Sequence, residues 1–173
     1  HQMKKIMITA LLALFLSGCD NSPPAPYGFK WGQSVEEIQK LNLEGASECK
    51  DPACSIMETP NGAYGLTTLI FYKDSGLAQV IHSEPLNETN KDDVIAKFNH
   101  ISNELKSIYG NPTSEIIRID DEENFINCLK QISCRDIKAE YNNIDGYRVF
   151  VSIGTRKEDG RLSIFTDHQR PLK

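Results

Sequence analysis

The feature that most constrains the fold is a short apolar run near the start of the chain. Residues 3–5 are a methionine and two lysines, and residues 6–16 then form an almost unbroken apolar run that ends in small residues. A charged start, a short apolar centre and small residues at its end are typical of a secretory signal peptide. With 11 residues the run is too short to cross a bilayer, which takes about 20 apolar residues in a helix. We therefore expect the folded body to begin after residues 1–18, of which residues 1–2 precede the natural start.

The four residues that close this run, Leu16, Ser17, Gly18 and Cys19, resemble the lipobox of bacterial lipoproteins. The pattern of that family is a large apolar residue, a small residue, glycine or alanine, and then cysteine, and every position matches. The resemblance covers residues 3–19. It implies that Cys19 becomes the first residue of the mature chain, acylated on its sulfur and on its new amine. Two or more acyl chains give stable membrane attachment, whereas one gives only reversible binding. An ordinary signal peptide cut elsewhere, with a free thiol at position 19, is the alternative.

The residues after this cysteine predict a location and a tether. Asp20 follows Cys19, and in enteric lipoproteins an aspartate at that place resembles the signal that retains the protein on the inner membrane. We therefore expect a protein that faces the periplasm from the inner membrane, with the outer membrane as the alternative. Residues 21–26 contain three prolines, which favour an extended chain. We interpret residues 19–26 as a lipid-anchored tether.

The remaining chain, residues 27–173, has the size of one ordinary globular domain. Without the signal peptide the protein loses two of its 19 basic residues and none of its 24 acidic residues, so its net charge changes from −5 to −7. Such a surface repels nucleic acid and anionic lipid headgroups. It suits a basic protein partner, or it simply confers solubility.

The cysteines predict two disulfides. If Cys19 carries lipid, four cysteines remain: Cys49, Cys54, Cys128 and Cys134. An even number in an exported protein indicates disulfides, because that compartment is oxidising. Three pairings are open, and closeness in sequence favours Cys49–Cys54 and Cys128–Cys134. Loops this short would each stabilise the fold by only about 2 kcal/mol. A zinc site is the alternative, but no histidine lies near either pair.

The hydrophobic pattern predicts an α+β fold. We expect a single domain with an antiparallel sheet, one long and two short helices packed on one face, and a three-stranded meander at the C-terminal end. The long helix is predicted over residues 91–109, where apolar residues recur at helical spacing from Val94 to Tyr109. Gly110 and Pro112 follow at the positions where helices end.

Two further segments predict the short helices. Ser34 and Glu37 form a capping box, which predicts a helix over residues 35–42. Apolar residues recur at helical spacing over residues 125–132. The acidic run 120–123 would then occupy the first turn of this second helix, where the helix dipole favours negative charge.

The strands are predicted from alternation of apolar and polar residues. Tyr27, Phe29 and Trp31 alternate with other residues, which predicts a half-buried strand over residues 27–32 with Trp31 in the core. Four more strands are expected at residues 54–59, 65–73, 77–82 and 115–119, the second and third forming a hairpin. The C-terminal meander is expected at residues 137–141, 147–153 and 162–166. The tail from Asp167 onward is expected to be loose.

No constellation in the sequence predicts catalysis. The chain lacks the Gly-x-Ser-x-Gly elbow of serine hydrolases and a glycine-rich phosphate loop. His82, His100 and His168 lie far apart, and none has a histidine or cysteine at metal-ligand spacing. His100 is expected to be solvated on the long helix. We therefore expect no catalytic residue, no metal and no cofactor.

Export, tethering, an acidic surface and disulfides together favour a protein that acts by contact. This profile resembles that of periplasmic immunity and inhibitor lipoproteins, which would imply that the chain occludes a secreted antibacterial hydrolase, such as a phospholipase or a cell-wall hydrolase. The acidic residues that we expect to contact such a partner are Asp120, Asp121, Glu122, Glu123, Asp74, Glu158 and Asp159. A structural or assembly accessory of the envelope is the alternative.

Overall fold

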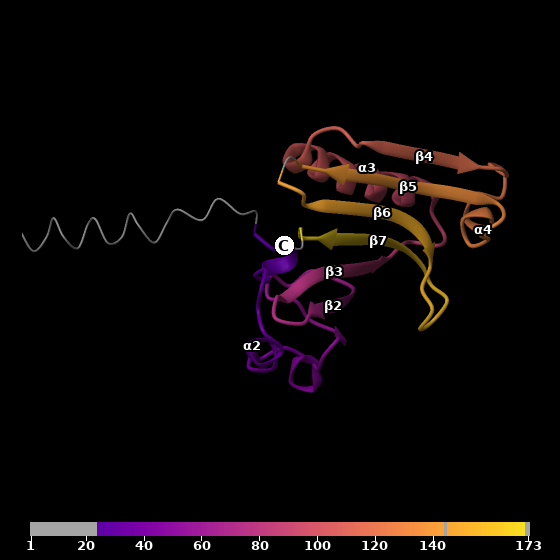
Figure 1. Cartoon of the computed structure of the whole chain (residues 1–173). Helices are drawn as coiled ribbons and strands as arrows, with labels where there is room; N and C mark the ends of the chain where they lie inside the picture. Colours follow the sequence, from indigo (N-terminus) through magenta and orange to yellow (C-terminus); the bar gives the residue numbers. More distant parts are fainter. Residues whose placement is uncertain (1–23, 144, 172–173) are drawn as a thin grey trace, which may run out of the picture.

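The chain folds around one seven-stranded antiparallel sheet in the order β1-β2-β3-β7-β6-β5-β4 (Figure 1). The computed structural model describes residues 24–143 and 145–171, so the predicted signal peptide, Cys19 and Asp20 lie outside these residues. The strands are β1 (Ala53–Ile56), β2 (Leu66–Tyr72), β3 (Gly76–Pro85), β4 (Ser114–Ile119), β5 (Arg135–Asn142), β6 (Arg148–Thr155) and β7 (Leu162–Gln169). The helices are α2 (Val35–Gln39), α3 (Lys91–Tyr109) and α4 (Phe125–Leu129), with the 3-10 turns η1 (Pro26–Gly28) and η2 (Ala46–Glu48).

This architecture confirms the predicted α+β fold and its C-terminal meander. β5, β6 and β7 follow one another along the chain and pair as antiparallel neighbours. Val149, Val151 and Ile153 of β6 are buried, whereas Phe150 and Ser152 between them are half-buried. The alternation arises because successive side chains of a strand point to opposite faces of the sheet.

The long helix α3 begins and ends where the sequence predicts. The side chain of Asn90 accepts hydrogen bonds from the backbone N–H groups of Asp92 and Asp93, at 3.0 and 3.3 Å. These bonds satisfy two donors that the first turn would otherwise leave unpaired. Gly110 follows the last turn with φ +82°. Val94 and Leu105 point into the core, and α3 lies along the sheet behind β4, β5 and β6 (Figure 1).

The sheet carries two separate hydrophobic cores on its helix-bearing face. The first core lies under α3 and α4 and is formed mainly by β5, β6 and β7, with Tyr141, Val149 and Ile164 fully buried. The second core lies under α2 and the N-terminal segment and is formed by β1, β2 and β3, with Ile38 and Leu69 fully buried. Burial of apolar area of this kind is the main force that holds helices on a sheet.

The predicted strand over residues 27–32 is wrong. Tyr27 lies in η1 with φ +61°, and Gly28 and Gly32 have φ of +85° and +83°. Three positive φ values in six residues bend the chain, which no strand allows. The alternating aromatics still pack inward: Phe29 is buried in the second core, whereas Trp31 is only half-buried at its rim.

Two predicted boundaries also differ in the short helices. α2 ends at Gln39 rather than at residue 42, although Ser34 caps it as expected, its hydroxyl accepting from the N–H of Glu37 at 3.1 Å. α4 begins at Phe125, so the acidic run 120–123 precedes the helix and does not form its first turn.

The C-terminal tail is not loose up to residue 171. β7 continues to Gln169, and the backbone N–H of Arg170 donates to the carbonyl of Ala78 at 3.1 Å. The guanidinium of Arg170 also donates to the carbonyl of Ser75. Pairing with β3 therefore extends the last strand beyond its apolar residues.

Both predicted disulfides are present. Cys49 pairs with Cys54 and Cys128 pairs with Cys134, with Cα–Cα distances of 5.1 and 5.2 Å. Disulfides persist in oxidising compartments, so the pair fits an extracytoplasmic protein. Within the described residues, no helix is both long enough and apolar enough to cross a membrane.

The N-terminal segment is joined to the central hairpin by a close backbone approach at Gly76. The N–H of Gly32 donates to Leu77 O at 3.0 Å, and the N–H of Leu77 donates to Gln33 O at 2.8 Å. Gly76 has φ +68°, and a Cβ atom there would lie 2.3 Å from the carbonyl oxygen of Gly32. Only glycine fits both the conformation and the space.

We predict that Gly76→Ala lowers the free energy of unfolding by about 2–4 kcal/mol, from the left-handed conformation together with the steric clash. Gly160→Ala is the matched control, because Gly160 has φ +70° but no atom lies within 4 Å of its added Cβ. The control should cost about 1 kcal/mol. Urea unfolding of both variants measures the difference. Equal losses would show that the approach of Gly32 to Gly76 does not constrain the fold.

Candidate functional site

A polar seam separates the two hydrophobic cores where β3 pairs with β7. In that pairing His82 stands opposite Thr166, and Val80 stands opposite His168. His82 and Thr166 are buried, and His168 is half-buried at the C-terminal end of β7. Polar side chains here interrupt what would otherwise be a continuous apolar face, which makes the seam the natural place for a cleft.

The seam opens between α3 and the sheet as a hollow of about 500 Å³, called here the histidine cleft. The polar residues that line it include Tyr27, His82, Thr166 and His168, with His100 at its mouth. Its apolar walls are formed by Ile101, Leu105, Ile108 and Ile164. Two ion pairs of α3 stand at the mouth, Lys97–Glu84 at 2.8 Å and His100–Glu104 at 3.1 Å.

Tyr27 enters this cleft from the N-terminal segment. Its ring stacks on His82 with a centroid distance of 4.4 Å and lies edge-on to His168 at 5.9 Å. Burial raises the pKa of the Tyr27 hydroxyl, although a hydrogen bond with Thr166 lowers it in part. The backbone of Tyr27 has φ +61°, a conformation that non-glycine residues rarely adopt.

Both histidines of the seam have pKa values below the usual range. Nδ1 of His82 shares a hydrogen bond with Thr67 Oγ1 at 2.7 Å, and Nε2 shares one with the Tyr64 carbonyl at 2.8 Å. Burial lowers the pKa of His82, partly offset by the bond to Tyr64. Burial, together with the nearby His82, lowers the pKa of His168 to about 4. Nδ1 of His168 is buried and has no hydrogen-bond partner among the described residues.

The structure therefore brings together three histidines that the sequence analysis kept apart. His82, His100 and His168 all line the histidine cleft. Among residues 24–143 and 145–171, no group of three or more histidines, cysteines, aspartates or glutamates could hold a metal ion. Because both nitrogens of His82 are already bonded, the cluster orders Tyr27 and the seam.

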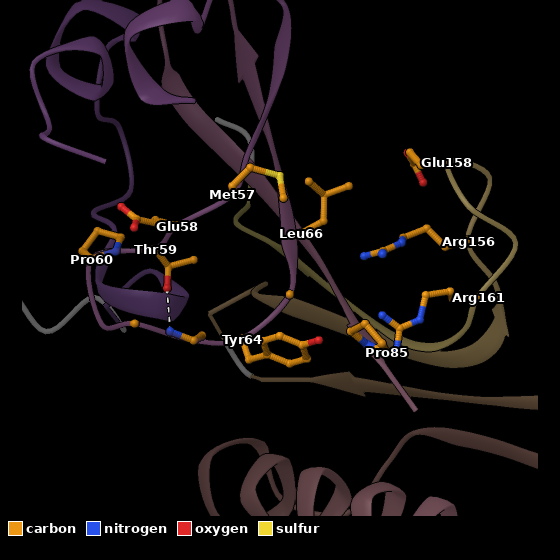
Figure 2. A pocket seen from close by; sticks show the side chains of 13 residues that line it. Met57, Glu58, Thr59, Pro60, Tyr64, Leu66, Pro85, Arg156, Glu158 and Arg161 are labelled. Atoms are coloured by element: carbon orange, nitrogen blue, oxygen red, sulfur yellow. Dashed lines mark hydrogen bonds between the residues drawn. The ribbon is translucent and has the colours of Figure 1, made fainter. Parts of the chain in front are cut away.

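A second hollow, of about 750 Å³, lies beside the hairpin that joins β6 and β7 (Figure 2). We call it the hairpin groove and define it by Met57, Tyr64, Leu66, Pro85, Arg156 and Arg161. Figure 2 shows the two guanidinium groups directed from the hairpin towards Leu66 and Pro85, with the Tyr64 hydroxyl facing them. Tyr64 and Met57 are 67% and 56% exposed, which is high for large side chains of this kind.

A third hollow, of about 450 Å³, lies between these two. It shares Tyr64 and Pro85 with the hairpin groove. It shares Tyr64, Glu84, Lys97 and His100 with the histidine cleft. Tyr64 lines all three hollows, which therefore adjoin one another, and we call them together the trough. A row of adjoining hollows suits an extended segment better than a compact molecule.

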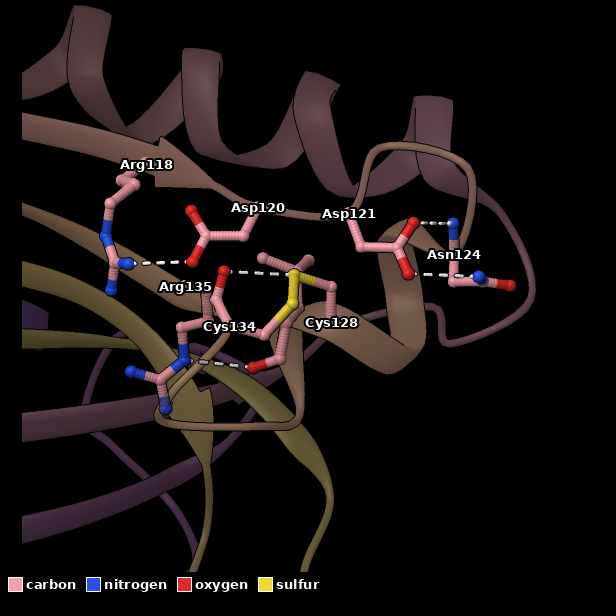
Figure 3. Close-up of a disulfide and its surroundings, with 8 residues drawn as sticks. Arg118, Asp120, Asp121, Asn124, Cys128, Cys134 and Arg135 are labelled. Carbon is pink, nitrogen blue, oxygen red and sulfur yellow. Dashed lines mark hydrogen bonds and ion pairs between the residues drawn. A yellow bond between two sulfur atoms is a disulfide. The ribbon is translucent and has the colours of Figure 1, made fainter.

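The acidic residues predicted as contacts do not form one surface. Asp120 pairs with Arg118 at 2.8 Å, and Glu122 pairs with Lys91 at 3.2 Å. Asp121 accepts from the backbone and side-chain N–H groups of Asn124 at 3.2 and 3.0 Å, which lowers its pKa (Figure 3). The run that includes Glu123 therefore orders the loop before α4, beside the Cys128–Cys134 disulfide.

The other predicted contacts lie at two ends of the sheet. Asp74, in the β2–β3 turn, lies at the opposite end of the strands from Glu158 and Asp159 in the β6–β7 hairpin. Only Glu158 lines the hairpin groove. Asp159 is bound to the guanidinium of Arg156, with N–O distances of 3.1 and 2.5 Å.

No family model, no curated protein and no solved structure matches this chain.

The residues that line the trough are mostly not among those predicted from the sequence. Arg156 and Arg161 flank a turn, where basic residues are common, and Tyr64 and Met57 lie in an irregular segment between β1 and β2. Tyr64 carried one usable signal, since an aromatic residue in a polar loop is often exposed for binding. The sequence holds no comparable signal for the seam, because His82 and His168 come together only through the pairing of β3 with β7.

The buried histidines predict a loss of stability in acid. A histidine whose pKa falls on folding binds its proton more readily in the unfolded chain, so stability is complete above pH 6.5 and declines as the pH falls towards the folded pKa. For His168 the window is pH 6.5 to about 4, and the full decline is on the order of 3 kcal/mol. Urea unfolding between pH 7.5 and 4.5 should show it.

His168→Gln should flatten this decline, with His82 supplying what remains. His100→Gln is the control, because His100 is exposed and paired with Glu104. Asp167 acts in the opposite direction, since burial raises its pKa, but it is common to all three proteins. An unchanged pH profile for His168→Gln would contradict the assignment.

Proposed function

We propose that this protein is a lipid-anchored periplasmic binding protein that acts by contact with a protein partner. The observation that carries the proposal is the trough with Tyr64 at its centre. Tyrosine, methionine and arginine are the residue types most enriched where proteins bind one another. Tyr64, Met57, Arg156 and Arg161 lie together beside the hairpin groove, in an otherwise acidic protein.

Within this class we propose an immunity or inhibitor protein. It neutralises a secreted antibacterial hydrolase, a phospholipase or a cell-wall hydrolase, by covering the cleft of that enzyme. The β6–β7 hairpin projects beyond the sheet and carries Glu158 and Asp159 on its turn, so it is suited to enter such a cleft. The net charge of −7 on the mature chain would speed its encounter with a basic enzyme.

Binding without turnover is supported by the state of the polar groups in the trough. His82 uses both ring nitrogens in hydrogen bonds, and burial lowers the pKa of His168 far below neutrality. Neither is therefore poised as a general base that exchanges protons near pH 7. Arg156 is already bound to Asp159.

The proposed anchor is Cys19, five residues before the first described residue, Pro24. Acyl chains on Cys19 would keep the domain at the membrane surface. Asp20 would keep it on the inner membrane, facing the periplasm. Nucleic acid is not an expected partner for this charge.

A second candidate, a structural or assembly accessory of the envelope, is favoured by the free edge of the sheet. β4 is the last strand in the order, and Ile116 and Ile117 on it are exposed, Ile117 to 57%. An exposed apolar edge strand is a site where another chain can add a strand. Deletion of an accessory would weaken the envelope even when no toxin is present, whereas loss of an inhibitor would not.

We predict that Cys19→Ser moves the protein from the membrane fraction to the soluble periplasmic fraction of the producing bacterium. Without the thiol no thioether to a diacylglycerol can form, and the mature chain loses its acyl chains. Fractionation and intact-mass measurement of the mature protein provide the test. A wild-type mature protein that carries no lipid mass on Cys19 would overturn the anchoring.

We predict that Tyr64→Ala lowers the affinity for the captured partner at least tenfold, as truncation of an aromatic hot spot does. The chain from residue 20 to 173, which contains both cores and both disulfides, is immobilised and exposed to secreted proteins of sibling cells. Captured material is then assayed for phospholipase and wall-hydrolase activity with and without the protein.

Ile132→Ala is the matched control, since Ile132 is 82% exposed but lies outside the trough. It should leave capture unchanged. If no hydrolase is captured or inhibited, and deletion of the gene leaves cells resistant to their siblings, the inhibitor proposal fails.

A further inference from the structure

The hairpin groove contains one arginine that is fixed in place. Arg156 is bound on two of its nitrogens by the carboxylate of Asp159, and its backbone N–H donates to Arg161 O at 2.9 Å. The bond to Asp159 is the main reason that the pKa of Arg156 is raised. Its side chain is only 14% exposed, so this guanidinium forms part of the groove wall.

The second arginine, Arg161, is held by its backbone and not by its side chain. The backbone N–H of Arg161 donates to Asp159 Oδ1 at 3.1 Å, which holds the turn. The guanidinium of Arg161 makes no hydrogen bond or ion pair within the described part of the chain, and Figure 2 shows it directed into the groove towards Pro85. A guanidinium in this state presents a full fork of donors to a ligand.

Three carboxylates lie near the groove, and within the described residues none of them forms an ion pair with Arg161. The carboxylate of Asp159 is held by Arg156, and its pKa is lowered to about 2. Glu58 accepts from the backbone N–H of Glu44 at 3.1 Å, on the far side from the hairpin. Glu158 also lines the groove, and its charge contributes to the raised pKa of Arg156. Arg161 is therefore the guanidinium of the groove that is left to bind a negative group, although the mature chain is strongly negative.

The remaining lining of the groove is apolar. Leu66 and Pro85 form its floor, and Met57 and the ring of Tyr64 flank the arginines (Figure 2). A ligand that fits must carry a negative group next to apolar groups, because an isolated anion would leave Met57 and Leu66 without contact. The adjoining hollow on the other side of Tyr64 offers room for the next residues of a bound chain.

We propose that the hairpin groove binds an extended acidic segment of the partner protein, with a carboxylate side chain on Arg161 and apolar neighbours on Tyr64 and Met57. This rests on the proposed function and deepens it, since it gives the groove a charge preference opposite to that of the whole surface. Guanidinium and carboxylate can form two parallel hydrogen bonds, which makes the pair directional as well as strong.

The test uses capped peptides and the chain from residue 20 to 173, labelled with ¹⁵N. The probe is acetyl-Gly-Leu-Asp-Leu-Gly-amide, and the comparison peptides carry asparagine or lysine in place of the aspartate. Titration followed by NMR should shift the amide signals of Tyr64, Leu66 and Arg161. The aspartate peptide should bind about tenfold more tightly than the asparagine peptide, as expected for a charged hydrogen bond, and the difference should shrink in high salt.

Arg161→Gln should reduce binding of the aspartate peptide about tenfold. Arg148→Gln is the matched control, because Arg148 lies on β6 outside the groove and pairs with Glu140 at 2.8 Å. Equal binding of the aspartate and asparagine peptides, or no shift at Tyr64 and Arg161 up to the solubility limit, would overturn the inference.

Two further outcomes distinguish this proposal from the proposed function and from binding of a lipid. If capture of a hydrolase is lost in Tyr64→Ala but not in Arg161→Gln, the proposed function stands, and the proposal of an acidic segment bound at Arg161 is rejected. Phosphatidylglycerol vesicles provide the other comparison. If they shift the Arg161 signals and the aspartate peptide does not, the ligand of Arg161 is a lipid phosphate, and the proposal is rejected.

Discussion

The pairing of β3 with β7 is the interaction on which the rest of the structure depends. β1, β2 and β3 with α2 form one half of the domain, and β4 to β7 with α3 and α4 form the other. Seven residue pairs, from Gln79–Gln169 to Pro85–Ser163, join the halves into one sheet. Each half has its own apolar core, and the seam between them carries the polar residues. A shift of one residue in this register would place the side chains of His82 and Thr166 on opposite faces of the sheet.

The seam explains why binding residues gather on this face. Apolar side chains fill the two cores, and polar side chains are buried between them. A buried polar group needs hydrogen-bond partners, and His82 has them in Thr67 and the carbonyl of Tyr64. α3 covers one core and α2 covers the other, and the seam between the cores opens as the histidine cleft along one side of α3. The N-terminal segment fills part of that space with Tyr27. The loop that carries Tyr64 and the β6–β7 hairpin border the rest. Recognition and architecture therefore share the same few residues.

The elements that the sequence predicts well are those whose signal is local. α3 has a full apolar stripe, an Asn cap and a terminal glycine, and its bounds are those expected. β6 and β7 alternate clearly, and the two disulfides join cysteines five and six residues apart. The prediction for residues 27–32 is wrong because an alternating aromatic pattern in the sequence is compatible with a strand and also with a bent segment. The trough could not be predicted, since His82 and His168, or Tyr64 and Arg161, meet only through pairings of distant strands.

The hydrogen bonds between the N-terminal segment and the start of β3 have a mechanical consequence. Residues 24–33 lead onto the start of β3, where Leu77 accepts a hydrogen bond from the N–H of Gly32 and donates one to the carbonyl of Gln33. A force applied to the N-terminal end of the domain would therefore act on β3, which is paired with β2 on one side and with β7 on the other. A bound partner drawn away from the bilayer would load these bonds before it could peel off any outer strand. The N-terminal segment is therefore joined to an interior strand of the sheet and not to an edge strand, so the domain is suited to resist a force applied at that end.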